Sequence, residues 1–256
     1  MKADFIRVIR VLRWLFFAVL PVFCAVSLAA AEPEPWPEWR APLIARFTDE
    51  LKTADAAVAE SPKSVAALSH RGDLHLFLGH FSEAVADFEK MIALAPAEDA
   101  PHWRLGIAYY FDGQFAKSAR QFEKYHAYDG HDRENGIWKF LAQTKVDGLE
   151  KARVEMLTYT QFDREPFPAL YEMFAGKRMP DDVLAEVERK GLADPRALFF
   201  GHYYTGLGEA ALGHRDRAIA LLRRAVEDPE AQSAGYMWQV ARLHWERLLA
   251  EERAAQ

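Results

Sequence analysis

The sequence predicts an all-α fold, a solenoid of antiparallel helix pairs that forms a superhelix with capping helices at its ends. Three observations predict it. One unit of 34 residues is written twice over residues 65–132, the other segments show apolar residues at helical spacing, and no segment shows the alternation of a strand. Half of the 256 residues are apolar and 27% are charged, as in ordinary globular proteins.

The two copies of the unit share identical residues at four places. Shifted by 34 positions, the equivalent pairs are Gly72 and Gly106, Gly79 and Gly113, Phe81 and Phe115, and Phe88 and Phe122. A glycine inside a helix costs roughly 1 kcal/mol relative to alanine, so Gly72 and Gly106 predict a helix crossing too close for a side chain. Gly79 and Gly113 are expected to end the first helix of each pair in the left-handed conformation.

A period of 34 residues is that of tetratricopeptide repeats, and the chain resembles this family. The resemblance implies that certain positions of each repeat line a concave, protein-binding face. Counted in this way, the lining consists of Phe77, Trp103, Ile107, Tyr110, Phe111, Phe200 and Tyr203. Aromatic groups with a polar tip are frequent in protein-binding surfaces. The alternative is that these side chains pack between neighbouring helices or against the terminal helix.

The N-terminal segment, residues 1–31, has the organisation of a secretory signal peptide. A basic stretch over residues 1–13 precedes an apolar run and three alanines, which predicts cleavage after Ala31 and a periplasmic or secreted protein. The alternative is an uncleaved anchor in the inner membrane, since residues 14–31 are just long enough to cross a bilayer. Lipidation of Cys24, the only cysteine, is not expected, because Phe23 stands where a lipobox has a small residue.

Residues 32–42 are rich in proline and are expected to form an extended spacer before the solenoid, which spans residues 43–256. Residues 43–59 predict an amphipathic helix that caps the first repeat, and Ser61 with Pro62 is expected to open the helix after it. The two regular repeats occupy about residues 65–98 and 99–132.

Beyond residue 132 the repeat pattern decays and then returns. Residues 133–198 are read as two degenerate repeats, in which Phe140 replaces the mid-helix glycine and residues 149–159 form a second helix. The signature reappears over residues 199–230, with Gly206 and Gly213 at the spacing of Gly72 and Gly79. Residues 232–251 predict a terminal helix whose polar residues cap the solenoid.

Charge and motifs exclude several classes of function. The formal net charge is −6, and it is −9 without the basic residues 1–31, so nucleic acid is not an expected partner. Zinc-protease, serine-hydrolase, Walker and paired-cysteine motifs are missing from the sequence. The glycines of residues 206–211 are attributed to helix packing rather than to a dinucleotide site, and His126 and His131 to a solvated turn. No catalytic residue, cofactor or metal site is predicted, and an enzyme is not expected.

Three stretches are also similar to the NlpI family of bacterial periplasmic lipoproteins. They are residues 102–110 with the turn at Gly113, residues 170–176, and the segment from residues 201–204 to residues 225–226. What this resemblance implies is a homodimeric, non-catalytic adaptor of the cell envelope. Such adaptors deliver substrates to a C-terminal processing protease or organise peptidoglycan hydrolases. The chain departs from the family at Cys24, so an outer-membrane anchor is not implied.

Overall fold

The structure, a computed structural model, describes residues 36–191 and 194–255, and it confirms the predicted all-α fold. The predicted signal peptide, Cys24 and residues 32–35 of the spacer lie outside the described residues. Within the described ranges no strand occurs. The helices in chain order are α1 (Arg40–Glu60), α2 (Val65–Leu78), α3 (Phe81–Leu94), η1 (Pro96–Glu98), α4 (Trp103–Phe111), α5 (Phe115–Tyr128), α6 (Arg133–Asp147), α7 (Leu149–Val154), α8 (Phe167–Phe174), α9 (Pro180–Gly191), α10 (Pro195–Ala211), α11 (Arg215–Glu227), η2 (Ala231–Ala234) and α12 (Tyr236–Ala255).

The two regular pairs, α2 with α3 and α4 with α5, are held by a glycine that lies under a phenylalanine. A Cβ atom on Gly72 would lie 2.6 Å from Cε1 of Phe88, and one on Gly106 would lie 2.7 Å from Cε2 of Phe122. Both phenylalanines are fully buried. In the second pair the Ser118 hydroxyl also donates a hydrogen bond of 2.7 Å to the Gly106 carbonyl. The predicted close crossing is therefore confirmed in both pairs.

The turns inside the pairs confirm the predicted left-handed glycines. Gly79 and Gly113 have φ angles of 81° and 78°, and Gly213 repeats the turn in the returning pair with 85°. In the first of these turns the amide of His80, the residue after Gly79, donates a 2.9 Å hydrogen bond to the carbonyl of His75. This bond satisfies one of the carbonyls that a helix end leaves without a partner.

Two predicted helix starts differ from the structure. Helix α1 begins at Arg40, so the last three residues of the predicted extended spacer are helical, and Pro42 lies in the first turn, where proline is tolerated. Helix α2 begins at Val65 rather than after Ser61, because the Ser64 side chain accepts a hydrogen bond of 3.2 Å from the Ala67 amide. Ser61 and Pro62 lie between the two helices.

The middle of the chain departs furthest from the predicted pattern. Helix α7 ends at Val154, whereas the sequence predicts a helix to residue 159. The loop over residues 155–166 follows, and it returns Tyr159 to α6. The closely covered glycine is Gly136, not the position of Phe140: a Cβ there would lie 2.5 Å from the Tyr159 hydroxyl oxygen. A loop thus takes the place of the second helix.

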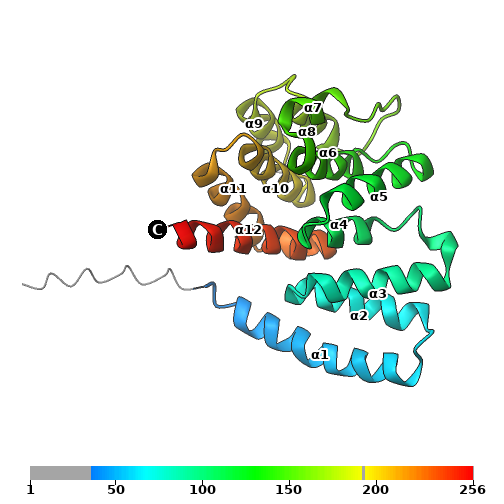
Figure 1. Cartoon of the computed structure of the whole chain (residues 1–256). Coiled ribbons are helices and arrows are strands. Elements are labelled where there is room, and N and C mark those ends of the chain that lie inside the picture. Colours follow the sequence, from blue (N-terminus) through cyan, green and yellow to red (C-terminus); the bar gives the residue numbers. More distant parts are fainter. Residues whose placement is uncertain (1–35, 192–193, 256) are drawn as a thin grey trace, which may run out of the picture. The chain divides into compact units, whose positions relative to one another are not determined.

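Helix α12 begins after the short η2 turn and lies inside the helix array instead of capping it. Figure 1 shows it between α1–α3 on one side and α6–α11 on the other. Its buried apolar residues are Met237, Trp238, Val240, Ala241, Leu243 and Trp245. The predicted polar cap is therefore replaced by a helix that is apolar on more than one face, as expected for a buried helix.

Polar contacts fasten α12 to the first helices. The guanidinium of Arg242, only 1% exposed, donates hydrogen bonds to the Phe77 carbonyl of α2 and to the Glu246 carboxylate. Arg40 of α1 pairs with the same carboxylate at 2.6 Å. This cluster ties the C-terminal helix to the N-terminal ones. Losing one partner of the buried ion pair would leave an uncompensated charge.

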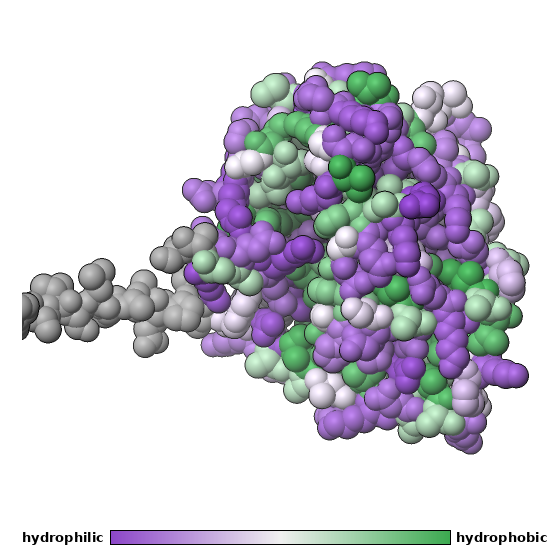
Figure 2. All heavy atoms as spheres, in the orientation of Figure 1, coloured by the Kyte–Doolittle hydropathy of each residue, from purple (hydrophilic) through white to green (hydrophobic). Residues whose placement is uncertain are grey.

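Figure 2 shows that the visible face is mainly hydrophilic, with separate hydrophobic residues rather than one continuous patch. Among the described helices, none is long and apolar enough to span a bilayer.

Candidate protein-binding groove

The predicted lining of the concave face is largely buried. Ile107, Tyr110, Phe111, Phe200 and Tyr203 are between 0% and 7% exposed, and only Phe77 and Trp103 are partly exposed. The structure therefore brings five of these side chains into the core and packs Phe77 and Trp103 against it, as in the alternative in which they pack against other helices.

Helix α12 covers most of this lining. The His244 ring lies 4.6 Å from that of Phe111 and 5.5 Å from that of Tyr110, and the Tyr203 hydroxyl lies 2.9 Å from His244 Nδ1. Phe200 instead packs on Phe167 of α8, with ring centroids 5.1 Å apart. A partner-binding role for the buried residues stays a prediction, and it would require α12 to leave its place.

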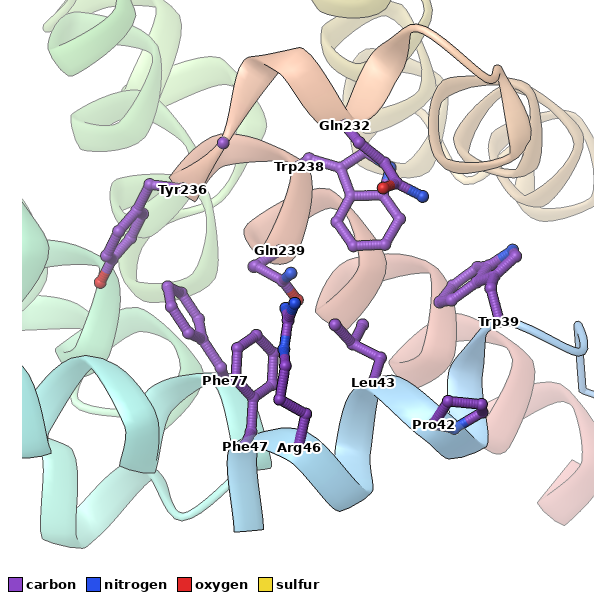
Figure 3. A pocket seen from close by; sticks show the side chains of 11 residues that line it. Trp39, Pro42, Leu43, Arg46, Phe47, Phe77, Gln232, Tyr236, Trp238 and Gln239 are labelled. Atoms are coloured by element: carbon purple, nitrogen blue, oxygen red, sulfur yellow. The ribbon is translucent and has the colours of Figure 1, made fainter. Parts of the chain in front are cut away.

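A groove remains open between α1 and the start of α12, with a volume of about 680 Å³. We call it the α1–α12 groove, and Figure 3 shows its side chains. The lining residues are Trp39, Pro42, Leu43, Arg46, Phe47, Phe77, Gln232, Gly235, Tyr236, Trp238 and Gln239. Of the predicted site residues only Phe77 belongs to it, and Trp103 lies behind its Tyr236 wall, with ring centroids 4.8 Å apart.

The aromatic side chains of the groove come from the first two helices and from the start of the last one. Trp39, the residue before α1, packs on Trp238 with ring centroids 5.2 Å apart. Phe77 in the last turn of α2 lies between Phe47, at 5.4 Å, and Tyr236, at 4.9 Å. These contacts fix the rings before any ligand arrives, which lowers the entropy lost on binding.

The polar part of the groove is small. Arg46 is exposed and is the only charged residue among the lining side chains; its guanidinium lies 5.1 Å from the centroid of the Phe47 ring. Gln239 accepts a hydrogen bond of 3.0 Å from Arg242 at its side-chain oxygen. Arg46 also pairs with Glu50 of the same helix at 3.6 Å, where both side chains are exposed. The groove therefore offers apolar aromatic walls and, in exchange with Glu50, one positive charge for an apolar segment that carries a negative charge.

The sequence contained signals for this groove that the repeat pattern did not use. Trp36 and Trp39 stand next to the first helix, and Tyr236 and Trp238 stand at the start of the last one. Aromatic residues that flank the repeat array on both sides indicate that the first and last helices pack together.

A polar cluster at the start of α6 is the second place with notable chemistry. The Tyr204 hydroxyl donates a hydrogen bond of 2.6 Å to Glu134, and Arg164 pairs with the other carboxylate oxygen. Burial, followed by the nearby charge of Asp132, raises the pKa of Glu134 to about 7. Both oxygens of this carboxyl group are engaged by the protein itself, so the arrangement serves to satisfy a buried acid.

The described residues contain no group of three or more His, Cys, Asp or Glu side chains placed to hold a metal ion.

Comparison with known proteins gives similarities for part of the chain and for the fold. Residues 34–129 match the family described as bacterial transcriptional activator domain, which is less than half of the chain. A solved tetratricopeptide repeat protein from Parabacteroides merdae is 16% identical, with 85% of this chain and 87% of that chain covered and a TM-score of 0.47. The helix pairs described above are themselves those of a tetratricopeptide-like helical repeat, a fold that typically mediates protein–protein interaction.

Proposed function

We propose that the protein is a non-catalytic scaffold of the bacterial cell envelope that holds an extended segment of a partner protein in the α1–α12 groove. The observation that carries the proposal is the division of the aromatic residues. Those along the inner face are covered by α12, whereas those of the groove are pre-arranged around a volume of about 680 Å³.

The groove chemistry favours an extended, proline-containing segment with an acidic residue. Proline-rich segments keep an extended conformation without internal hydrogen bonds, and they bind to aromatic-lined grooves in several protein families. The exposed Arg46 at the edge of the groove supplies the complementary charge for the acid. Charges at the rim of an interface act mainly on the association rate and on specificity.

The place in the envelope rests on the sequence. The basic and apolar residues 1–31 support export, and the similarity to the NlpI family supports an adaptor that delivers substrates to a C-terminal processing protease or organises peptidoglycan hydrolases. A homodimer is part of the same proposal. In the alternative form the signal stays attached, and the protein is an assembly subunit anchored in the inner membrane.

The test compares partner capture by the exported protein and by two charge-reversed variants. Arg46→Glu changes the groove, and Arg120→Glu changes an exposed arginine of α5 as the matched control. Proteins recovered from the envelope are quantified by mass spectrometry. A processing protease or cell-wall hydrolase that is lost with Arg46→Glu and kept with Arg120→Glu supports the proposal. Equal recovery by both folded variants contradicts the groove assignment.

The match of residues 34–129 favours a second candidate, an interaction module of a protein that regulates transcription. The intact mass and location of the natural protein separate the candidates. A chain that begins at Glu32 and is recovered from the periplasm supports the envelope scaffold. A chain that retains residues 1–31 in the membrane fraction supports the anchored form, and an unprocessed chain in the cytoplasm supports the regulatory module.

A further inference from the structure

A second cavity, of about 340 Å³, lies beside the C-terminal half of α12 and shares no lining residue with the α1–α12 groove. We call it the basic cavity. It lies where α4, α5, α6, α10 and α11 meet α12, and its lining residues are Tyr110, Phe115, Leu141, Thr144, Lys145, Leu207, Ala210, Ala211, Gly213, Arg215, His244, Arg247, Leu248 and Glu251. Its volume is within the range of about 300–1,000 Å³ that is usual for small-molecule sites.

The charged residues of the cavity leave it positive in an acidic protein. Arg215 and Arg247 both pair with Glu251, at 3.1 and 3.2 Å, so one carboxylate serves two guanidinium groups. Lys145 is exposed and forms no ion pair with any of the described residues. Three cations thus face a single anion, whereas the chain as a whole has a net charge of −6.

His244 adds no charge to this balance. It is buried, and this burial together with the charges of Arg247 and Lys145 lowers the pKa of its imidazole to about 3. At neutral pH the imidazole is therefore uncharged, and the positive charge of the cavity resides on its lysine and two arginines.

The buried side of the cavity carries a hydroxyl group that the protein leaves without a partner. Tyr110 is 7% exposed, and its hydroxyl makes no hydrogen bond within the described residues. Burial raises its pKa to about 12, so the hydroxyl keeps its proton and can donate. The charges of Arg247 and Glu251 act on this group, which indicates that it faces the charged end of the cavity.

We propose that the basic cavity binds a small carboxylate with a short apolar tail. Lys145 and Arg247 would hold the carboxylate, the Tyr110 hydroxyl would donate to it, and the tail would lie against apolar residues. These apolar residues are Phe115, Leu141, Leu207 and Leu248. A small molecule fits better than a peptide, because the walls are helices whose backbone groups are already paired, whereas extended peptides usually bind through main-chain hydrogen bonds.

The test measures binding of octanoate to the exported protein at pH 7.5 by calorimetry, with acetate and octan-1-ol as probes that lack the tail or the charge. The expected result is one octanoate per chain and at least tenfold weaker binding of both other probes. Exchanging Lys145→Gln and Arg247→Gln together should weaken octanoate binding at least tenfold, and Tyr110→Phe roughly fivefold, as for one lost hydrogen bond. Lys63→Gln, an exposed lysine between α1 and α2, should leave binding unchanged.

Three results would overturn the proposal. One is the lack of octanoate binding at millimolar concentration, and another is equal binding of octanoate and octan-1-ol. The third is a peptide with a free, apolar C-terminus that binds at least tenfold more tightly than octanoate, which would assign the cavity to protein ends instead.

Discussion

The regular pairs α2–α5 and the middle of the chain cover a mid-helix glycine in different ways. In the regular pairs the covering ring belongs to the next helix, Phe88 over Gly72 and Phe122 over Gly106. In the middle the nearest group over Gly136 is the hydroxyl of Tyr159, which lies in the loop that follows α7, and the Tyr171 ring of α8 lies beside it. A helix fixes a ring through its own backbone hydrogen bonds, whereas a loop has to be fixed by side-chain contacts.

The two regions also differ in what the buried space contains. The regular crossings are closed by fully buried phenylalanine rings. At the start of α6, by contrast, a buried carboxyl group is held by Tyr204 and Arg164. Polar networks of this kind are costly when they are incomplete, and they respond to pH. The buried carboxyl group therefore predicts that the middle region responds to pH near neutrality.

The largest expected effect concerns the covering rings. Phe122→Ala should lower the free energy of unfolding by about 3–5 kcal/mol, because a fully buried ring leaves a cavity that helices cannot close. Tyr159→Ala should cost less than half of that, since the ring is only partly buried and its loop can collapse. Urea unfolding followed by circular dichroism measures both. Equal losses would break the comparison, and Phe162→Ala, at a 76% exposed position, is the control.

The next effect is a pH dependence that belongs to the middle region. The folded protein raises the pKa of Glu134 from 4.5 to about 7, so the folded state keeps a proton that the unfolded chain releases between these values. The stability from this group is complete below pH 4.5 and is lost as the pH rises through 7. The groups facing it are Asp132, Asp163, Arg164 and Tyr204.

In the measurement, the free energy of unfolding of the wild type minus that of Glu134→Gln is followed from pH 4.5 to pH 8. This difference should fall by an amount on the order of 2–3 kcal/mol. Parallel pH curves for the two proteins would show that the Glu134 carboxyl titrates alike in the folded and unfolded chains.

The next smaller effect is the loss of stability when each of two glycines is replaced by alanine. Gly106→Ala should destabilise by about 1–3 kcal/mol, because the new Cβ meets the Phe122 ring and forces the crossing helices apart. Gly136→Ala should cost less than Gly106→Ala, because the Tyr159 hydroxyl at 2.5 Å can shift with its loop and the helix gains about 1 kcal/mol of propensity, although the Tyr171 ring at 2.9 Å has to yield as well. Thermal unfolding of both variants decides, and a larger loss at Gly136 would contradict the comparison.

The smallest effect is local. The Tyr171 hydroxyl donates a hydrogen bond of 2.8 Å to the Leu157 carbonyl and so ties the loop to α8. Tyr171→Phe should cost about 1 kcal/mol and accelerate hydrogen exchange in residues 155–166. Exchange in α2–α5 should not change. Tyr128→Phe, at a 65% exposed position, should leave the loop as it is in the wild type.

Much of the fold could be predicted from the sequence, because each repeat carries the residue types that its helix crossing requires. A glycine sixteen positions before a large apolar residue marks a helix crossing, and Gly206 with Leu222 repeats the spacing of Gly72 with Phe88. In the middle the partners of Gly136 are Tyr159 from a loop and Tyr171 from α8, both at other spacings, so the rule could not identify them.

The candidate groove could be predicted only in part. The repeat positions indicated Phe77 and placed Trp103 nearby, but a periodic pattern does not say which helix fills the inside of a solenoid. That depends on contacts between distant residues, such as Trp39 with Trp238. The spread of apolar residues around α12 is the signal in the sequence that distinguishes a buried helix from a polar cap.

The position of α12 also has a consequence for how the chain acquires its structure. An open solenoid can fold from one end, because each repeat contacts only its neighbours. Here α12 is synthesised after the helices whose inner faces it covers, and Arg242 joins it to Phe77, 165 positions earlier in the chain. The inner aromatic faces of the earlier helices therefore stay uncovered until α12 is in place. We expect the docking of α12 to be a slow step of folding, because contacts between distant residues carry a large loop-closure cost.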